Sequence, residues 1–119
     1  MSDINTSLTQ LLEIDGARCT SLVDASSGMV LGEAGSGVDM ELAAAGNSEV
    51  VKAKLETMKS LKLKEKITDI LITLDTQYHI IRPIESQEGL FIYLVLGKDK
   101  SNLALARRKV QEIEKELTV

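Results

Sequence analysis

The sequence predicts an α/β domain of the α+β kind, in which a five-stranded antiparallel sheet lies between helices. Five short apolar segments are joined within each half of the chain by links of hairpin length, and three other segments carry apolar residues at helical spacing. Residues 90–96 are apolar at every position, which is typical of a central strand that is covered on both faces. The predicted order is therefore helix, strand, strand, helix, strand, strand, strand, helix.

The first half of the chain begins with a helix and a hairpin. Asp15-Gly16 ends the helix, because glycine suits the left-handed cap that closes many helices. Strands are expected at residues 19–24 and 29–33, and the turn cluster at 25–28 predicts a tight antiparallel connection between them. The expected core face of the first helix consists of Ile4, Leu8, Leu11 and Leu12.

The second half is expected to form three strands, at residues 67–74, 78–84 and 90–96, and a last helix. Pro83 cannot donate a ladder hydrogen bond, so it marks either a strand end or a sheet edge. Ser101 is the expected cap of the last helix, since its side-chain oxygen can accept a hydrogen bond from a free amide of the first turn. One narrow face of this helix is apolar: Leu103, Ala106, Val110, Ile113 and Leu117.

A long helix is expected at residues 39–61, with the Asp39 carboxylate capping its first turn. Its charged residues fall on one narrow strip, and the remaining arc is roughly twice the ~100° stripe of an ordinary surface helix. Such a helix needs two covering surfaces. One is the protein's own sheet, against which we expect Ala44, Val51, Leu55 and Met58. The other is most simply a second copy of the chain, and its predicted interface is Leu42, Ala43, Gly46, Val50 and Ala53, with Leu61 on the same side.

Gly46-Asn47-Ser48 in the middle of this helix allows two interpretations. A glycine there costs roughly 1 kcal/mol relative to alanine, so the helix could break at Asn47 and restart. Alternatively the helix continues, and Gly46 lets another helix approach closely. Continuity is favoured because both apolar sides run across the gap and because Lys52 and Glu56 are spaced for a helical ion pair.

Length and composition predict a single soluble domain over residues 1–119. No apolar run approaches the ~20 residues of a membrane helix, and the amino terminus lacks a secretory layout, so we expect no membrane insertion and a cytoplasmic location. The net charge of -4 and the three aromatic residues argue against nucleic acid as a partner. The basic run at 107–109 points in several directions on its helix and is expected to be a solvated face.

Candidate catalytic and ligand-binding residues are few. Cys19 and His79 could in principle form a nucleophile and its base, but both lie in predicted strands and no third group is expected to orient the histidine. The glycines of the loop 32–37 precede a helix, yet they lack a phosphate-loop ending and are better interpreted as a plain loop. One histidine and one cysteine make a transition-metal site improbable. We therefore expect no catalytic residue, no cofactor and no metal.

At this point the chain resembles the roadblock (dynein light chain) domain family, as a bacterial-type member, over nearly all of its length. The resemblance is carried by short patterns whose order and spacing match together. They are Leu8, Leu11-Leu12 and Gly16; Leu22-Val23-Asp24 with Ser27-Gly28-Met29-Val30-Leu31; Asp39-Met40-Glu41-Leu42-Ala43-Ala44-Ala45; Tyr78-His79-Ile80-Ile81-Arg82-Pro83-Ile84; and Asn102-Leu103-Ala104-Leu105-Ala106-Arg107. The chain departs from the commonest bacterial pattern at Gly46-Asn47-Ser48, where alanine or leucine is more usual.

The resemblance implies a roadblock/profilin-like sheet with the long helix on one face and the first and last helices on the other. It also implies pairing of two copies through their sheets and long helices, and no enzymatic activity of the domain alone. Bacterial members of this kind bind a Ras-like small GTPase, which makes regulation of such a GTPase the leading functional hypothesis. A constitutive structural subunit of a larger complex is the alternative. A small-molecule sensor that uses the loop 35–37 is a third and weaker one.

Overall fold

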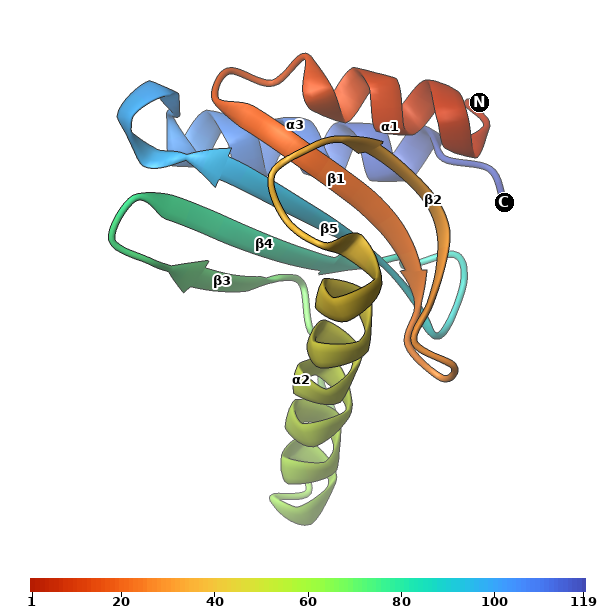
Figure 1. The fold of residues 1–119 in the computed structure, drawn as a ribbon. Coiled ribbons are helices and arrows are strands. Elements are labelled where there is room, and N and C mark those ends of the chain that lie inside the picture. The colour runs from red at the N-terminus through yellow and green to blue at the C-terminus, as the bar shows by residue number, and fades with distance from the viewer.

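A computed structural model describes residues 1–119 and contains the predicted sequence of helices and strands (Figure 1). The long helix and the five strands appear in the expected order, which confirms the predicted fold class. The elements are α1 (Ile4–Leu12), β1 (Ala17–Asp24), β2 (Met29–Gly35), α2 (Met40–Ser60), β3 (Ile70–Thr73), β4 (Gln77–Pro83), β5 (Leu90–Gly97), the short 3-10 turn η1 (Lys98–Lys100) and α3 (Leu103–Glu116).

The five strands form one antiparallel sheet in the order β2-β1-β5-β4-β3. The apolar strand β5 is at the centre, and its side chains from Phe91 to Leu96 are each no more than 1% exposed. This confirms that a strand without alternation is covered on both faces. Pro83 is the last residue of β4, an interior strand, so its missing N–H marks a strand end and not a sheet edge.

The helices cover the sheet in two unequal layers (Figure 1). α1 and α3 lie side by side on one face, over a core that includes Leu11, Leu22 and Val110. α2 lies on the other face, over a core that includes Val23, Tyr93 and Val95. The two ends of the chain meet beside α1 and α3, where the Ser2 amide donates to the Glu116 carbonyl at 2.6 Å.

Two glycines sit where the backbone requires them. Gly16 has φ +85 and follows α1, and a Cβ there would overlap the Ser101 hydroxyl. Gly28 has φ +75 in the tight turn between β1 and β2, where the Asp24 carboxylate also accepts a hydrogen bond from the Ser26 amide at 3.0 Å. The predicted hairpin is present, whereas the predicted left-handed helix cap is not: α1 ends at Leu12 with Glu13 as its cap, and Gly16 lies in the turn that leads into β1.

Two more predicted boundaries are wrong. β3 covers only Ile70–Thr73, because its ladder with β4 stops before Pro83, which has no N–H, and because Arg107 of α3 holds Asp69 through two hydrogen bonds of 2.8 Å. Arg107 is 46% exposed, as expected of a solvated basic face, but it also pairs with Asp69. Asn102, not Ser101, caps α3 by accepting from the Leu105 amide at 3.1 Å, whereas the Ser101 hydroxyl donates to the Gly97 carbonyl.

A buried ion pair joins β4 to α3 beneath the two-helix layer. Arg82 Nε donates to Glu114 Oε1 at 3.0 Å, and the two side chains are 10% and 4% exposed. The second Glu114 oxygen accepts from the Glu85 amide at 3.4 Å. Glu114 thus occupies a core position of an otherwise apolar helix face.

Removing one member of this pair leaves a buried charge without its partner. We expect Arg82→Met to lower the free energy of unfolding by about 3 kcal/mol, whereas the double variant Arg82→Met/Glu114→Leu recovers most of the loss. Urea unfolding at one fixed protein concentration measures both. A double variant no more stable than Arg82→Met would contradict the expectation.

Candidate functional site: the outer side of the long helix

α2 is continuous from Met40 to Ser60, so the helix does not break at Asn47. The Asp39 carboxylate accepts a hydrogen bond from the Leu42 amide at 3.2 Å and caps the first turn, as predicted. The helix ends where Lys62 takes a positive φ of 59 and the Leu63 amide reaches back to the Met58 carbonyl at 2.9 Å. The chain then returns to β3 (Figure 1).

The inner side of α2 is buried within the chain. Ala44, Ser48, Val51 and Met58 are between 0% and 8% exposed. The Ser48 hydroxyl, which the sequence pattern did not place in the core, donates to the Ala44 carbonyl at 2.7 Å and so remains satisfied. Leu55, expected on this inner side, is 48% exposed, although Val51 and Met58 on either side of it in the sequence are buried. The second half of α2 extends past the sheet (Figure 1).

The outer side of α2 has no cover in the chain. Leu42 is 72% exposed, Val50 39% and Leu61 62%, and Ala53 is exposed as well. A Cβ added at Gly46 would meet no atom within 4 Å. Of the five predicted interface residues, only Ala43 is half-buried, where it packs against the α2 side of the sheet.

The charged strip beside this outer side carries a weak ion pair. Lys52 Nζ lies 3.9 Å from Glu49 Oε1, one helical turn earlier. Lys52 therefore pairs with Glu49 and not with Glu56, which the spacing had suggested. Both side chains are exposed, so the pair contributes little to stability.

A polar network lies on the α2 face of the sheet. The Tyr93 hydroxyl is 3.0 Å from His79 Nδ1, and His79 Nε2 is 2.8 Å from Gln77 Oε1. The two rings pack edge to face with centroids 5.4 Å apart. Burial lowers the pKa of His79, and burial raises the pKa of Tyr93 even though Asn47 of α2 acts in the opposite direction. His79 is therefore a neutral packing residue under α2.

The enzymatic and anion-binding alternatives find no support in this geometry. Cys19 is fully buried, and burial raises the pKa of its thiol, which opposes thiolate formation. Both ring nitrogens of His79 are already engaged by Gln77 and Tyr93. The loop after β2 leads into a helix start that the Asp39 carboxylate occupies, which disfavours an anion there.

The structure offers neither a cluster of metal-binding residues nor a helix that could cross a membrane. No three His, Cys, Asp or Glu residues come together in an arrangement that could hold a metal ion. None of the helices combines the length and the apolar composition that crossing a bilayer requires.

Comparisons with known proteins find the fold and no sequence relative. No protein-family model matches the sequence, and a search of curated proteins finds no match. Among solved structures, a Roadblock/LC7 domain from Streptomyces avermitilis superposes with a TM-score of 0.82 at 14% identity, covering 97% of this chain and 94% of that one. Myxococcus xanthus MglB gives a TM-score of 0.83 at 17% identity, with 95% and 89% covered.

The chain has the Roadblock/LC7 fold. An MglB with a tetrameric arrangement shares it as well, with a TM-score of 0.70 at 17% identity over 95% of this chain and 88% of that one. The predicted resemblance to the roadblock family is thereby confirmed at the level of the fold. Within this roadblock fold, α2 is the helix that covers one face of the sheet alone.

The low pKa of His79 predicts a pH dependence of stability. In the unfolded chain His79 titrates near pH 6.5, whereas in the folded chain its pKa is lower. Between these two values the unfolded chain binds a proton that the folded chain does not, so the free energy of unfolding falls as the pH drops through this range. Above about pH 6.5 the contribution of His79 is level. His79→Asn keeps an acceptor for the Tyr93 hydroxyl without titrating, and should flatten this slope in urea unfolding. Equal slopes for the variant and the wild type would exclude His79 as the source. Hydrogen bonds lower the pKa values of Asp3 and Asp24, so these two carboxylates change the stability only in the more acidic range, below about pH 3.8.

Proposed function

We propose that this chain is a roadblock-family adaptor that works as a homodimer and binds a Ras-like small GTPase, whose nucleotide cycle it modulates without catalytic groups of its own. The observation that carries the proposal is the uncovered apolar outer side of α2. The GTPase part rests on the family resemblance of the sequence, and the roadblock fold supports it. The GTPase would supply its own catalytic residues, which the dimer surface would order.

The size and shape of the outer side favour a second helix as its cover. Leu42 and Val50 are large and exposed, whereas Gly46 and Ala53 on the same side of the helix are small. A helix can approach closely over small residues, and its larger side chains then pack on either side of them. A soluble chain that left this stripe in water would carry an association-prone surface.

Nothing in the isolated chain requires a glycine at position 46. It lies in a regular helix, where glycine costs about 1 kcal/mol relative to alanine, and nothing nearby requires its small size. A partner helix that contacts Gly46 would give this cost a reason. Two copies related by a two-fold axis present the same side of α2 to each other, so the Gly46 of each copy would lie in the contact between the two helices. The tetrameric MglB supports self-association of this fold.

A charge on the outer side should separate the dimer. We expect Ala53→Lys to shift the molar mass in light scattering from dimer to monomer, because a lysine cannot be desolvated between two closely packed helices. Ala45→Lys is the matched control: Ala45 is also exposed on α2, lies beside the charged strip, and should leave the dimer intact. A wild type that is a folded monomer at all concentrations would sink the proposed pairing.

Gly46→Ala separates the two roles of the glycine. In a monomer it should raise the free energy of unfolding by about 1 kcal/mol, since a Cβ there meets open space. In a dimer with close helices it should weaken association instead. Unfolding and light scattering on the same sample show which effect occurs, and a stabilised, unweakened dimer would place Gly46 outside the interface.

The GTPase proposal is tested by capture from the native lysate. The tagged dimer is incubated once with GDP and once with a non-hydrolysable GTP analogue, and the retained proteins are identified by mass spectrometry. We expect a small GTPase that is retained mainly with the analogue and lost with Ala53→Lys. Partners retained equally with both nucleotides would instead favour a constitutive scaffold.

A further inference from the structure

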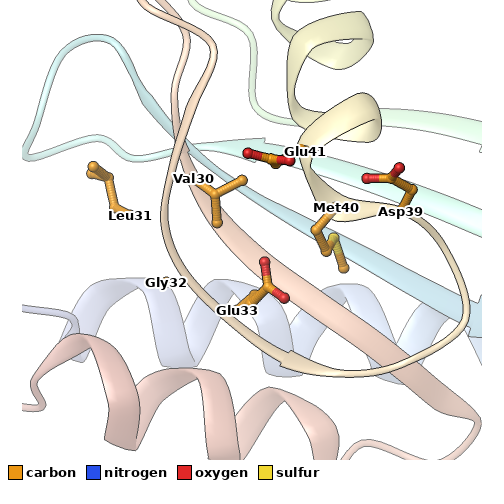
Figure 2. Close-up of a pocket in the computed structure, with 7 residues that line it drawn as sticks. All are labelled: Val30, Leu31, Gly32, Glu33, Asp39, Met40 and Glu41. Atoms are coloured by element: carbon orange, nitrogen blue, oxygen red, sulfur yellow. The ribbon is translucent and has the colours of Figure 1, made fainter.

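The edge strand β2 faces an open hollow at the start of α2. β2 has β1 as its only neighbour in the sheet, so one of its edges is free. A hollow of about 510 Å³ lies between residues 30–33 of this strand and residues 39–41 of α2 (Figure 2). It is separate from the outer side of α2 and has no part in the proposed pairing of two copies.

Apolar side chains stand along this edge. The register between β1 and β2 shifts beside Leu22 and Val23, and the resulting bulge leaves Leu31 without a partner residue. Figure 2 shows Leu31 pointing away from α2, and its side chain is 42% exposed. Met29, two residues earlier, is 62% exposed. Val30 and Met40 line the hollow itself.

All charged residues that line the hollow are acidic. Glu33, Asp39 and Glu41 line it together with apolar residues and one glycine, and no basic residue is among them (Figure 2). Asp39 is occupied by the cap of α2, whereas Glu33 and Glu41 are exposed and form no ion pair within the chain. The chain as a whole has a net charge of -4, which would steer a basic partner toward it.

A second copy of the chain is a poor occupant for this edge. In a two-fold contact the same surface patch of both copies is used, so Glu33 and Glu41 of both copies would lie in one interface to which the hollow brings no basic residue. Like charges placed opposite each other across paired strands destabilise the pairing. The complementary occupant is therefore a different protein that brings positive charge.

We propose that the free edge of β2 binds an extended basic segment of a partner protein, which adds as a further strand to the sheet. The backbone of β2 supplies hydrogen bonds, Leu31 and Met29 contact apolar side chains of the segment, and Glu33 and Glu41 contact its lysines or arginines. This is strand addition, in which main-chain bonds give affinity and alternate side chains give specificity.

Fluorescence anisotropy with a labelled peptide that alternates lysine and valine tests the proposal. We expect binding at low salt, weakened roughly tenfold by Glu33→Lys because an attraction becomes a repulsion. Glu112→Lys, on an exposed position of α3, is the matched control and should bind like the wild type. The same peptide with N-methyl groups on alternate residues keeps its charge but cannot extend the ladder, and should not bind.

Three outcomes would overturn the proposal. They are no binding of the unmethylated peptide, equal binding of the methylated peptide, and equal weakening by Glu33→Lys and Glu112→Lys, since the last two indicate attraction by charge alone. Circular dichroism of each variant confirms that it is folded. Light scattering separates this proposal from the α2 dimer: Glu33→Lys should leave the molar mass unchanged, and a change would assign the β2 edge to self-association instead.

Discussion

The structure depends on the burial of β5 on both faces. Its residues from Phe91 to Leu96 are apolar except for the Tyr93 hydroxyl and are all buried, so each face of the sheet needs a helical layer. The chain supplies the layers from different parts of its length. The two ends, α1 and α3, meet on one face, where the bridge between Ser2 and Leu117 ties them together. The middle of the chain supplies only α2 for the other.

The two faces of the sheet differ in how their buried polar groups are held. Two helices seal one side of the sheet, and their only buried charge, Glu114, is neutralised by Arg82. A single helix covers the other side, and polar groups remain beneath it: Tyr93 and His79 bond to each other, while the Ser21 hydroxyl is buried without a partner. Buried polar groups bond to one another where they can, because leaving them unpaired is costly. Both layers therefore hold buried polar groups, and the two-helix side also has one without a partner, the Ser7 hydroxyl.

Local signals in the sequence predicted most of the fold. Asp39 and Gly28 act within a few residues of their own positions, so their roles could be read from the sequence alone. Strand alternation likewise places Tyr78 and His79 on opposite faces of the sheet: Tyr78 packs on the α1 and α3 side, whereas His79 bonds to Tyr93 on the α2 side. The failures lie where distant residues decide. The length of β3 depends on the contact of Asp69 with Arg107, 38 residues away, and the burial of Glu114 depends on Arg82, 32 residues away.

The candidate site, too, was predictable only where residues within one element decide its structure. The wide apolar arc of α2 is a periodicity within one helix, so its outer residues could be named in advance, whereas Ala43 turned out half-buried because the sheet, not the helix, sets how far the contact reaches. The hollow beside β2 gave no such signal. Glu33 and Glu41 are ordinary surface residues in the sequence and become neighbours only because the loop after β2 folds the start of α2 back over that strand (Figure 2). The molecule thus carries two uncovered surfaces of different chemistry, one apolar with small residues and one acidic along a free strand. Because one surface requires an apolar partner that packs closely and the other requires a basic one, the two surfaces are suited to different partners.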